Sequence, residues 1–264
     1  GHWTRSLLLS PDKRQLYVGV GSLSNIADFG MEVEEGRAAI WQVDLEGGQA
    51  RVFASGLRNP VGMAWEPETG ALWTVVNERD GLGDETPPDY LTSVREGGFY
   101  GWPFCYWGQT IDDRVPQDPA EVARAIRPDY ALGGHTASLG LCWVPEGTLP
   151  GFGEGMAIGQ HGSWNRTTPV GARIMFTRLD ADGNAAGTEV FADGWLDEQT
   201  GEYRGRPMDV AFLRDGSMLV SDDFAGAIWR IAYVGGGSSD GAMTPAAAPE
   251  ADAAEDAARS EERR

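Results

Sequence analysis

The three histidines of this 264-residue sequence all lie in polar segments that contain glycine. His2 follows one glycine, His135 follows two, and His161 directly precedes another. None of them lies within an apolar run, so each is expected where a strand begins or ends. An imidazole titrates near neutral pH and often serves as a general base. A loop hydrogen bond is the alternative for each histidine, but the shared placement favours at least one catalytic base.

Two arginine-containing segments have a similar placement beside glycine and proline. Arg58 and Asn59 precede an apolar run that begins with proline, and Arg204 and Arg206 flank a glycine before another such run. The planar guanidinium group can donate two parallel hydrogen bonds to one carboxylate. These segments therefore indicate a site for an acidic ligand, with a structural salt bridge to one of the many acidic residues as the alternative.

Residues 77–85, with the sequence NERDGLGDE, combine oxygen-bearing side chains with two glycines. Calcium takes about six to eight oxygen ligands, which carboxylates and bent-backbone carbonyls supply. The spacing does not fit an EF-hand loop, so the segment by itself indicates a calcium site only weakly.

Short apolar runs separated by Pro, Asp, Asn and Gly dominate the sequence before residue 234, which predicts an all-β fold. Only residues 120–126 are expected to be helical. A strand, a turn with Pro, Asp or Gly and a second strand recur at residues 7–22, 62–78 and 209–223, and another strand type recurs at 40–45, 174–179 and 228–233. Such repeats, tens of residues apart, indicate a β-propeller. A β-sandwich is the alternative, but it does not explain the repeated turn.

The composition excludes several classes of protein. Forty acidic residues against 21 basic ones give a net charge of −19, which argues against binding of nucleic acid. No apolar stretch approaches the roughly 18 residues of a transmembrane segment.

Residues 1–234 are expected to form the propeller domain, and the Gly-, Ala- and acid-rich residues 235–264 are expected to form a disordered tail. Cys105 and Cys142 permit either one disulfide or two free thiols.

Eight segments, in order from His2 to about Tyr233, resemble the soluble PQQ-dependent sugar dehydrogenases (PQQ is pyrroloquinoline quinone), and in particular their L-sorbosone dehydrogenase-like branch, which is related to the soluble aldose dehydrogenases. The segments are GHWTRSLLLSPD, GLRNPVGMAWEP, NERDGLGDETPPDYL, GGFYGWPFCYWG, IRPDYALGGHTASLGL, IGQHGSWNR, GRPMDVAF and VSDDFAGAIWRI. The resemblance implies a six-bladed propeller, of which this chain holds about four blades. It also implies that PQQ lies over the central channel with Ca²⁺ beside it.

The resemblance further implies roles for single residues. His2 matches the catalytic base that takes the proton from the sugar's C1 hydroxyl while hydride passes to the quinone. Arg58 and Asn59 match an Arg-Asn pair over the quinone. Gly81 and Leu82 fall where backbone carbonyls hold Ca²⁺.

The carboxylate-binding arginines match the family only in part. Arg206 corresponds to the first of two arginines that bind PQQ carboxylates, whereas Met208 stands where the second is expected. The second contact is therefore either absent or supplied by Arg204 or Arg166.

Two further departures concern the cofactor and the substrate. His161 and Trp164 lie where the glucose enzymes have a PQQ-binding lysine region, and this chain has no lysine there. Ser22 replaces an aspartate near the substrate of the glucose enzymes, so glucose itself is not the expected substrate.

The implied function is oxidation of an aldose or a sorbosone-like sugar aldehyde, with electrons passing to an external acceptor in the periplasm or outside the cell. Family members carry further blades before the catalytic histidine, so we expect this chain to be part of a longer protein and to be poorly stable and inactive on its own. The alternative is a non-catalytic propeller that binds a protein or glycan partner. The joint presence of a candidate base and candidate carboxylate-binding arginines favours the enzyme.

Overall fold

The computed structural model describes residues 1–3 and 5–235, and one compact unit spans Gly1–Tyr233. The expected tail, 235–264, lies outside the described residues except for Gly235. No helix in the described ranges is long and apolar enough to cross a membrane.

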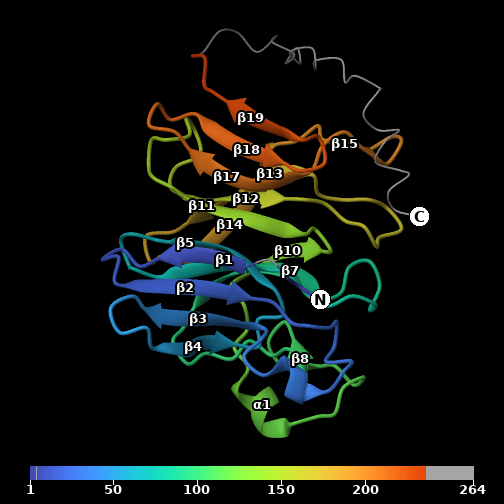
Figure 1. Cartoon of the computed structure of the whole chain (residues 1–264). Coiled ribbons are helices and arrows are strands. Elements are labelled where there is room, and N and C mark those ends of the chain that lie inside the picture. The colour runs from blue at the N-terminus through green and yellow to red at the C-terminus, as the bar shows by residue number, and fades with distance from the viewer. Residues whose placement is uncertain (4, 236–264) are drawn as a thin grey trace, which may run out of the picture. The chain divides into compact units, whose positions relative to one another are not determined.

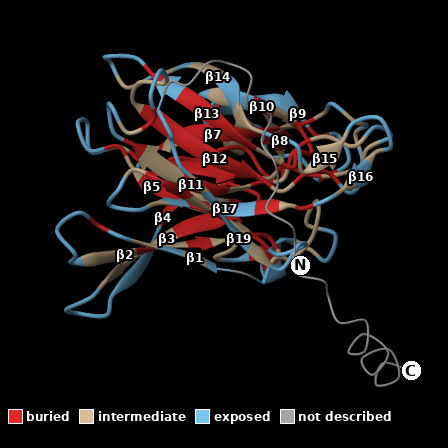
Figure 2. Cartoon of the chain, turned by 90° about the horizontal axis from the view of Figure 1, so that it is seen from above, coloured by how far each residue is buried: buried red, intermediate tan, exposed pale blue. Residues whose placement is uncertain are grey.

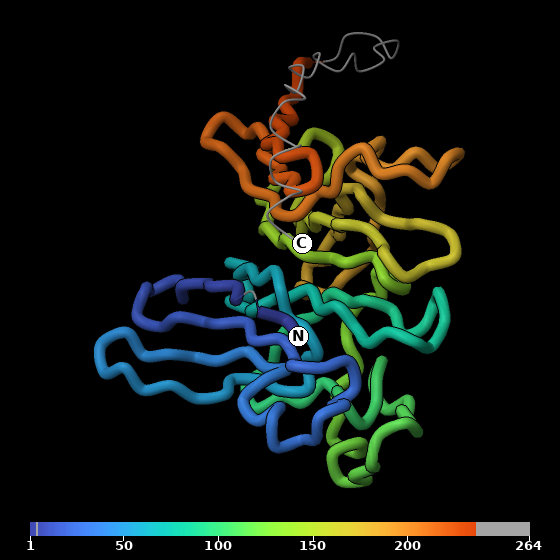
Figure 3. Tube along the Cα trace, turned by 45° about the vertical axis from the view of Figure 1, so that its right-hand side comes forward, coloured from blue at the N-terminus to red at the C-terminus, as the bar shows by residue number. Residues whose placement is uncertain are grey.

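Four antiparallel sheets follow one another along the chain (Figure 1). The first contains β1 (Arg5–Leu9), β2 (Gln15–Val20), β3 (Ala39–Asp44) and β4 (Ala50–Ser55), and the second contains β5 (Pro60–Trp65), β6 (Leu72–Val76), β7 (Pro88–Val94) and β10 (Tyr130–Gly134). The third contains β11 (Ser138–Val144), β12 (Gly155–Gln160), β13 (Arg173–Leu179) and β14 (Ala185–Ala192), and the fourth contains β17 (Pro207–Phe212), β18 (Met218–Asp222) and β19 (Ala227–Ile231). Figure 3 follows this path from the first sheet in blue to the fourth in orange.

Smaller elements lie in the connections. Two short hairpins pair β8 (Cys105–Tyr106) with β9 (Thr110–Ile111) and β15 (Leu196–Asp197) with β16 (Glu202–Tyr203). The expected helix is α1 (Pro119–Arg124), and Asp118 caps it by accepting a hydrogen bond from the amide of Ala120 at 3.0 Å. A 3₁₀ turn covers Met31–Glu34.

The sequence repeats correspond to equivalent strands of the sheets, and the all-β prediction is confirmed. The hairpins at 7–22, 62–78 and 209–223 are the first two strands of the first, second and fourth sheets. The other repeated strand type is the third strand of the first, third and fourth sheets, namely β3, β13 and β19.

The sheets pack face to face through their first strands, because β1 contacts β5, β5 contacts β11, and β11 contacts β17. Glycine permits this approach. A Cβ on Gly62 of β5 would lie 2.5 Å from the carbonyl oxygen of Leu139, and one on Gly140 of β11 would lie 2.6 Å from the Cα of Asp209. Face-to-face sheets joined in this way are the arrangement of successive propeller blades.

Each interface between neighbouring sheets contains one hydrophobic cluster, and Figure 2 shows these buried residues in red. Tyr17, Ile40 and Tyr90 belong to the first interface; Trp73, Leu91, Met156 and Ile158 to the second; and Ile174, Phe176, Val210 and Val220 to the third. Cys105 and Cys142 are both free thiols.

The first sheet has a second apolar face that packs against none of these clusters. Its strand register aligns Leu7, Val18, Trp41 and Val52 in one row across β1, β2, β3 and β4. Leu7 is 63% exposed, whereas its neighbour Leu8 points the other way and packs against the first cluster.

Candidate functional site

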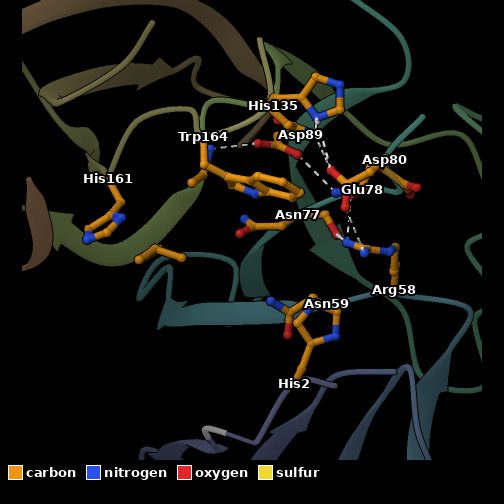
Figure 4. Close-up of a pocket in the computed structure, with 13 residues that line it drawn as sticks. His2, Arg58, Asn59, Asn77, Glu78, Asp80, Asp89, His135, His161 and Trp164 are labelled. Carbon is orange, nitrogen blue, oxygen red and sulfur yellow. Dashed lines mark hydrogen bonds and ion pairs between the residues drawn. The ribbon is translucent and has the colours of Figure 1, made fainter. Parts of the chain in front are cut away.

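Antiparallel pairing gathers most of the candidate residues at one end of the sheets. A first strand begins at the same edge at which the second strand ends, so residues before β1 and β5 meet residues after β6 and β12. These residues surround a cavity of about 310 Å³ (Figure 4). The cavity is lined by His2, Arg58, Asn59, Asn77, Glu78, Asp80, Asp89, His135, Ala137, Leu139, His161, Trp164 and Asn165.

His2 is held at the cavity wall by the backbone of Ser22. Its Nδ1 lies 2.9 Å from the carbonyl oxygen of Ser22, and its amide donates to the same oxygen at 3.2 Å. A carbonyl oxygen only accepts, so Nδ1 carries the proton and Nε2 keeps its lone pair. Burial, together with the charge of Arg58, lowers the pKa of His2 from 6.5 to about 4. His2 is therefore a neutral imidazole at physiological pH.

Arg58 is buried and uses all its donors on the protein. Nε donates to the carbonyl of Asn25 at 3.2 Å, and one terminal nitrogen donates to the carbonyls of Asn77 and Glu78 at 3.3 and 2.6 Å. The other terminal nitrogen donates to Oδ1 of Asn25 at 3.1 Å and lies 3.5 Å from a carboxylate oxygen of Asp80. Arg58 thus supplies a fixed positive charge without a free hydrogen-bond donor.

Asn59 is available to a ligand. Its side chain has no hydrogen-bond partner within the described part of the chain, although it lines the cavity. Both Asn59 and His2 lie against Gly21, where a Cβ would come within 2.2 Å of Asn59 Oδ1 and 2.6 Å of the His2 Cβ. A glycine at this position is therefore required to bring the two side chains together.

Two buried carboxyl groups form the floor of the cavity, Glu78 at the end of β6 and Asp89 at the start of β7. Asp89 accepts hydrogen bonds from the amides of Glu78 and Ala137, both at 2.9 Å, and from the hydroxyl of Thr136 at 3.2 Å. Oε1 of Glu78 has no hydrogen-bond partner among the residues that the structure describes. Burial raises the pKa of Glu78 to about 7 and that of Asp89 to about 6.

Asp80 connects the two sides of the site. Its Oδ1 accepts from Asn165 Nδ2 at 2.6 Å and lies 3.4 Å from Nδ1 of His135, whose Nε2 lies 2.9 Å from the carbonyl oxygen of Gly83. His135 has a φ of 56°, a left-handed conformation that is uncommon outside glycine. The surrounding contacts therefore hold His135 in place over Asp80.

His161 and Trp164 line the opposite wall, and Trp164 is 78% exposed. Nε2 of His161 lies 2.7 Å from Oδ1 of Asp223, which follows β18. An exposed indole beside a polar cavity offers a flat apolar surface to a planar ring or a sugar.

The structure places the other three expected arginines outside the cavity lining. Arg206 donates to the carbonyls of His161, Gly162 and Ser163 at 2.9, 2.6 and 3.1 Å, and its guanidinium lies 4.7 Å from the ring centroid of Tyr203. It thereby holds the loop that carries His161 and Trp164.

Arg166 and Arg204 bind other parts of the chain. Arg166 donates to the carbonyls of Asp84 and Gly134 at 2.5 and 3.0 Å and pairs with Glu85. Arg204 is exposed and pairs with Asp197 at 2.7 Å.

The expected calcium ligands also lie outside the cavity lining. Gly81 and Leu82 follow Asp80, and the carbonyl of Gly81 accepts a hydrogen bond from Arg114 at 2.9 Å. Among residues 1–3 and 5–235, no group of three or more His, Cys, Asp or Glu side chains is arranged to hold a metal ion. A calcium site here would therefore depend on backbone carbonyls and on the ligand itself.

Sequence reasoning missed two residues of this site. Asp89 lines the cavity, and Asp223 contacts it through His161. Both lie in segments that resemble the family, but no role was expected for either. Only the pairing of β18 with β17 and the packing of β17 on β12 bring Asp223 to His161.

Residues that line part of the cavity fit PQQ, which is a planar quinone with three carboxylates. His2 and Asn59 offer free polar atoms, Trp164 offers a ring surface, and Arg58 offers positive charge. The arginines expected for the carboxylates, Arg166, Arg204 and Arg206, do not line the cavity.

The comparisons with known proteins show the family. Residues 1–234 match the TrAA12-like family, so the chain belongs to that family. An uncharacterized protein of Borreliella burgdorferi is 30% identical over 237 residues, which cover 88% of this chain and 61% of that protein. The PQQ-dependent pyranose dehydrogenase of Coprinopsis cinerea is 25% identical over 305 residues, which cover 89% of this chain and 40% of that protein.

Solved structures show the same fold. A Trichoderma reesei protein of Carbohydrate-Active Enzymes Family AA12, solved in iodide and calcium forms, has a TM-score of 0.75 at 23% and 22% identity, over 87% of this chain and 68% of that one. The β-propeller is thereby confirmed and the β-sandwich alternative is wrong. The chain spans less than two thirds of the length of the curated relatives it matches.

Proposed function

We propose that this chain is part of a PQQ-dependent oxidoreductase that oxidises a sugar at its anomeric carbon. The observation that carries the proposal is His2: a neutral imidazole at the cavity wall, whose Nδ1 is bound to Ser22 and whose Nε2 has no partner in the described part of the chain. The family match and the similarity to the Coprinopsis cinerea pyranose dehydrogenase support it.

His2 acts as the general base in this proposal. Its free Nε2 accepts the proton of the sugar's C1 hydroxyl, and the carbonyl of Ser22 holds the ring orientation and stabilises the imidazolium that results. The chemistry that PQQ would supply when bound is acceptance of the hydride from C1. Such a base contributes about 10²–10⁴-fold to the rate.

The other cavity residues bind and orient the ligands. The side-chain amide of Asn59 would donate a hydrogen bond to the cofactor, and the buried charge of Arg58 would favour negative charge beside it. Trp164 packs on a ring surface at the cavity mouth. Arg206 acts indirectly, because it fixes the loop that carries Trp164.

Calcium would be held by the backbone of Gly81 and Leu82 together with the cofactor. The oxygen-rich segment 77–85 and the calcium form of the Trichoderma reesei relative support this assignment. The carbonyl of Gly81 would then have to exchange its hydrogen bond with Arg114 for the ion.

The proposed substrate is an aldose or a sorbosone-like sugar aldehyde rather than glucose, because Ser22 occupies the place of an aspartate of the glucose enzymes. The electrons would pass to an external acceptor in the periplasm or outside the cell. A non-catalytic propeller that binds a protein or glycan is the second candidate, and the exposed Trp164 favours it if PQQ does not bind.

The test uses the native gene product, with whatever residues it carries beyond this chain. It is loaded with PQQ and Ca²⁺ and assayed for dye reduction with a panel of aldoses and sugar aldehydes. Saturable dye reduction that needs PQQ supports the enzyme. If the protein does not bind PQQ but is retained by immobilised glycans on an array, the result supports the binding module instead.

A further inference from the structure

A second cavity, of about 550 Å³, lies beside the third sheet. It is bounded by residues 168–173, at the end of the connection from β12 to β13, and by residues between 193 and 201, which follow β14. Every residue that lines it differs from those that line the cavity beside His2. The second cavity is therefore separate from the candidate site.

Arg173, the first residue of β13, carries the positive charge of the second cavity. Its Nε donates to Oε1 of Gln160 at 2.8 Å, and Gln160, which faces Arg173 across β12 and β13, is fully buried. The side-chain amide of Gln160 donates in turn to Oγ of Ser138 at 3.2 Å. The two terminal nitrogens of Arg173 have no acceptor within residues 1–3 and 5–235. The guanidinium is thus anchored through Nε and keeps its terminal donors for a ligand.

Asp193 and Glu198 line the same cavity as Arg173 without pairing with it. Burial lowers the pKa of Arg173, and the charges of both carboxylates oppose this effect, so both lie near the guanidinium. Neither carboxylate forms an ion pair or accepts a hydrogen bond in the part of the chain that the structure describes. One donor group and two acceptor groups therefore surround a space in which a ligand can bond to all three.

The walls of the second cavity are held by hydrogen bonds of their own. The hydroxyl of Tyr203 lies 2.9 Å from the carbonyl oxygen of Ser163 and 3.1 Å from that of Val170, which ties the β15–β16 hairpin to the connection before β13. Oδ1 of Asp197 accepts from the amides two and three residues further on, at 3.0 and 3.2 Å, and so fixes the turn that carries Glu198. The cavity is preformed, and its volume is within the range of about 300–1,000 Å³ that small-molecule sites have.

The charges of the second cavity narrow the class of ligand. Two carboxylates against one guanidinium, in a chain of net charge −19, disfavour an anion. No group of three or more His, Cys, Asp or Glu side chains in the described ranges is arranged to hold a metal ion. A hydroxyl group both accepts and donates, so neighbouring hydroxyls on one neutral molecule can bond to the guanidinium and to the carboxylates together.

The remaining lining suits the carbon skeleton of such a molecule. Pro169, Val170 and Leu196 line the second cavity and offer apolar surface to the C–H groups of a ring. The loop glycines Gly194 and Gly201 also line it, and without side chains they leave the space beside their backbone open.

We propose that the second cavity is a binding site for a neutral saccharide, whose hydroxyl groups accept hydrogen bonds from Arg173 and donate to Asp193 and Glu198. The inference goes beyond the proposed function, because binding at this cavity needs neither PQQ nor His2. Hydrogen bonds to charged groups are stronger than those between neutral groups, so these three side chains should supply most of the affinity.

The experiment titrates glucose, maltose and cellobiose separately into the ¹⁵N-labelled native gene product, without PQQ, and follows the amide signals of Gly194 and Gly201. Glu198→Ala and Asp193→Ala each remove one acceptor from an exposed position, so the fold should be retained. Glu202→Ala is the matched control, since it removes an exposed glutamate of the same hairpin that does not line the cavity. We expect saturable shifts, a dissociation constant about 10-fold higher in Glu198→Ala and Asp193→Ala, and no change in Glu202→Ala.

Arg173→Gln tests the donor side of the second cavity. The new amide can still donate to Gln160, but the guanidinium is lost, so this variant should also bind the sugars about 10-fold more weakly or worse. A thermal unfolding scan of each variant confirms that the protein is folded.

Three results would overturn the inference. The first is that none of the three sugars shifts the signals of Gly194 and Gly201, and the second is that Glu198→Ala and Asp193→Ala bind sugar as tightly as the wild type. The third is that L-alanine, whose two charges also match the cavity, shifts these signals while the sugars do not. Saccharide binding at Gly194 and Gly201 by a protein that oxidises no sugar when loaded with PQQ would contradict the proposed function alone, and oxidation without these shifts would contradict this inference alone.

Discussion

Nδ1 of His2 lies 2.9 Å from the carbonyl oxygen of Ser22, and the amide of Ser22 donates to the carbonyl of Arg58 at 2.8 Å. The backbone of one buried residue therefore connects the candidate base to the candidate cofactor-binding arginine. His2 keeps Nε2 free because the Ser22 oxygen can only accept a hydrogen bond. The chemistry proposed for this site depends on that orientation.

Replacing His2 tests its role as the base. In the PQQ-loaded native gene product, His2→Gln is expected to lower kcat by about 10²–10⁴-fold, because Gln cannot take the proton of the sugar hydroxyl. Ser22→Ala is the control, since it removes the hydroxyl 3.3 Å from Nδ1 but keeps the carbonyl that orients the ring. An unchanged kcat in His2→Gln, measured by steady-state dye reduction, would rule out His2 as the base.

The low pKa of His2 predicts the acid limb of the pH profile. A base must be unprotonated to act, and burial beside Arg58 lowers the pKa of His2 from 6.5 to about 4. The value of kcat/KM should therefore stay constant as pH falls through 6.5 and should decline only near pH 4. A decline centred near pH 6.5 would show that another group carries the reaction.

Glu78 makes the stability depend on pH. Its pKa is about 7 in the folded chain against 4.5 for the free side chain, so the folded state binds more protons between these values. The free energy of unfolding contributed by Glu78 therefore falls as pH rises from about 4.5 to about 7. His2 acts in the opposite direction between pH 4 and 6.5, because its pKa is lowered on folding.

Glu78→Gln removes this titration. The variant should gain stability relative to the wild type as the pH rises, by on the order of 3 kcal/mol above pH 7. Urea unfolding of both proteins at pH 5, 6, 7 and 8 measures the difference. A difference that does not change with pH would show that Glu78 does not hold a proton in the folded chain.

Arg204 and Arg206, two residues apart, provide a matched pair. Arg206→Ala removes the donor to the carbonyls of His161 and Gly162 and one of the two donors to Ser163, which keeps Tyr203, so it should cost about 1–3 kcal/mol in unfolding free energy and weaken PQQ binding. Arg204→Ala removes an exposed ion pair with Asp197, which is worth about 0–1 kcal/mol. Similar losses in the two variants, measured by urea unfolding, would contradict the assigned role of Arg206.

Leu7 and Leu8 test which face of the first sheet is packed. Leu8→Ala should destabilise the 264-residue chain by about 1–2 kcal/mol, because Leu8 packs against the first hydrophobic cluster. Leu7→Ala should change it by about 0.5 kcal/mol or less, because Leu7 is 63% exposed. Both substitutions replace leucine by alanine in the same strand, so they change the strand propensity equally. The difference between their unfolding free energies therefore reports side-chain packing. Equal losses in urea unfolding would show that the face with Leu7 and Trp41 is covered.

The sequence predicted the strands that form local hairpins. The hairpins that begin at residues 7, 62 and 209 have apolar runs on both sides of a Pro-, Asp- or Gly-containing turn, so local pattern suffices. β14 is an outer strand with mostly small residues, in the sequence AAGTEVFA, and carries no such signal. β10 was not predicted either, because it pairs with β7 across a long insertion and forms no local hairpin.

The sequence predicted mainly those site residues that stand at the ends of apolar runs. His2, Arg58, Asn59 and His161 stand at such ends and line one cavity. Arg204 and Arg206 are also close to a strand start, but whether a guanidinium points into a cavity or back to a carbonyl depends on tertiary contacts. Asp89 and Asp223 reach the site through pairing between distant strands, which no local motif encodes.

The most direct test of the central claim is sugar oxidation by the PQQ-loaded native gene product and by its His2→Gln variant, with PQQ binding measured in parallel. We expect both proteins to bind PQQ and only the wild type to reduce dye with an aldose or a sugar aldehyde. A wild-type protein that binds PQQ and Ca²⁺ but oxidises no sugar, or a His2→Gln variant as active as the wild type, would contradict it.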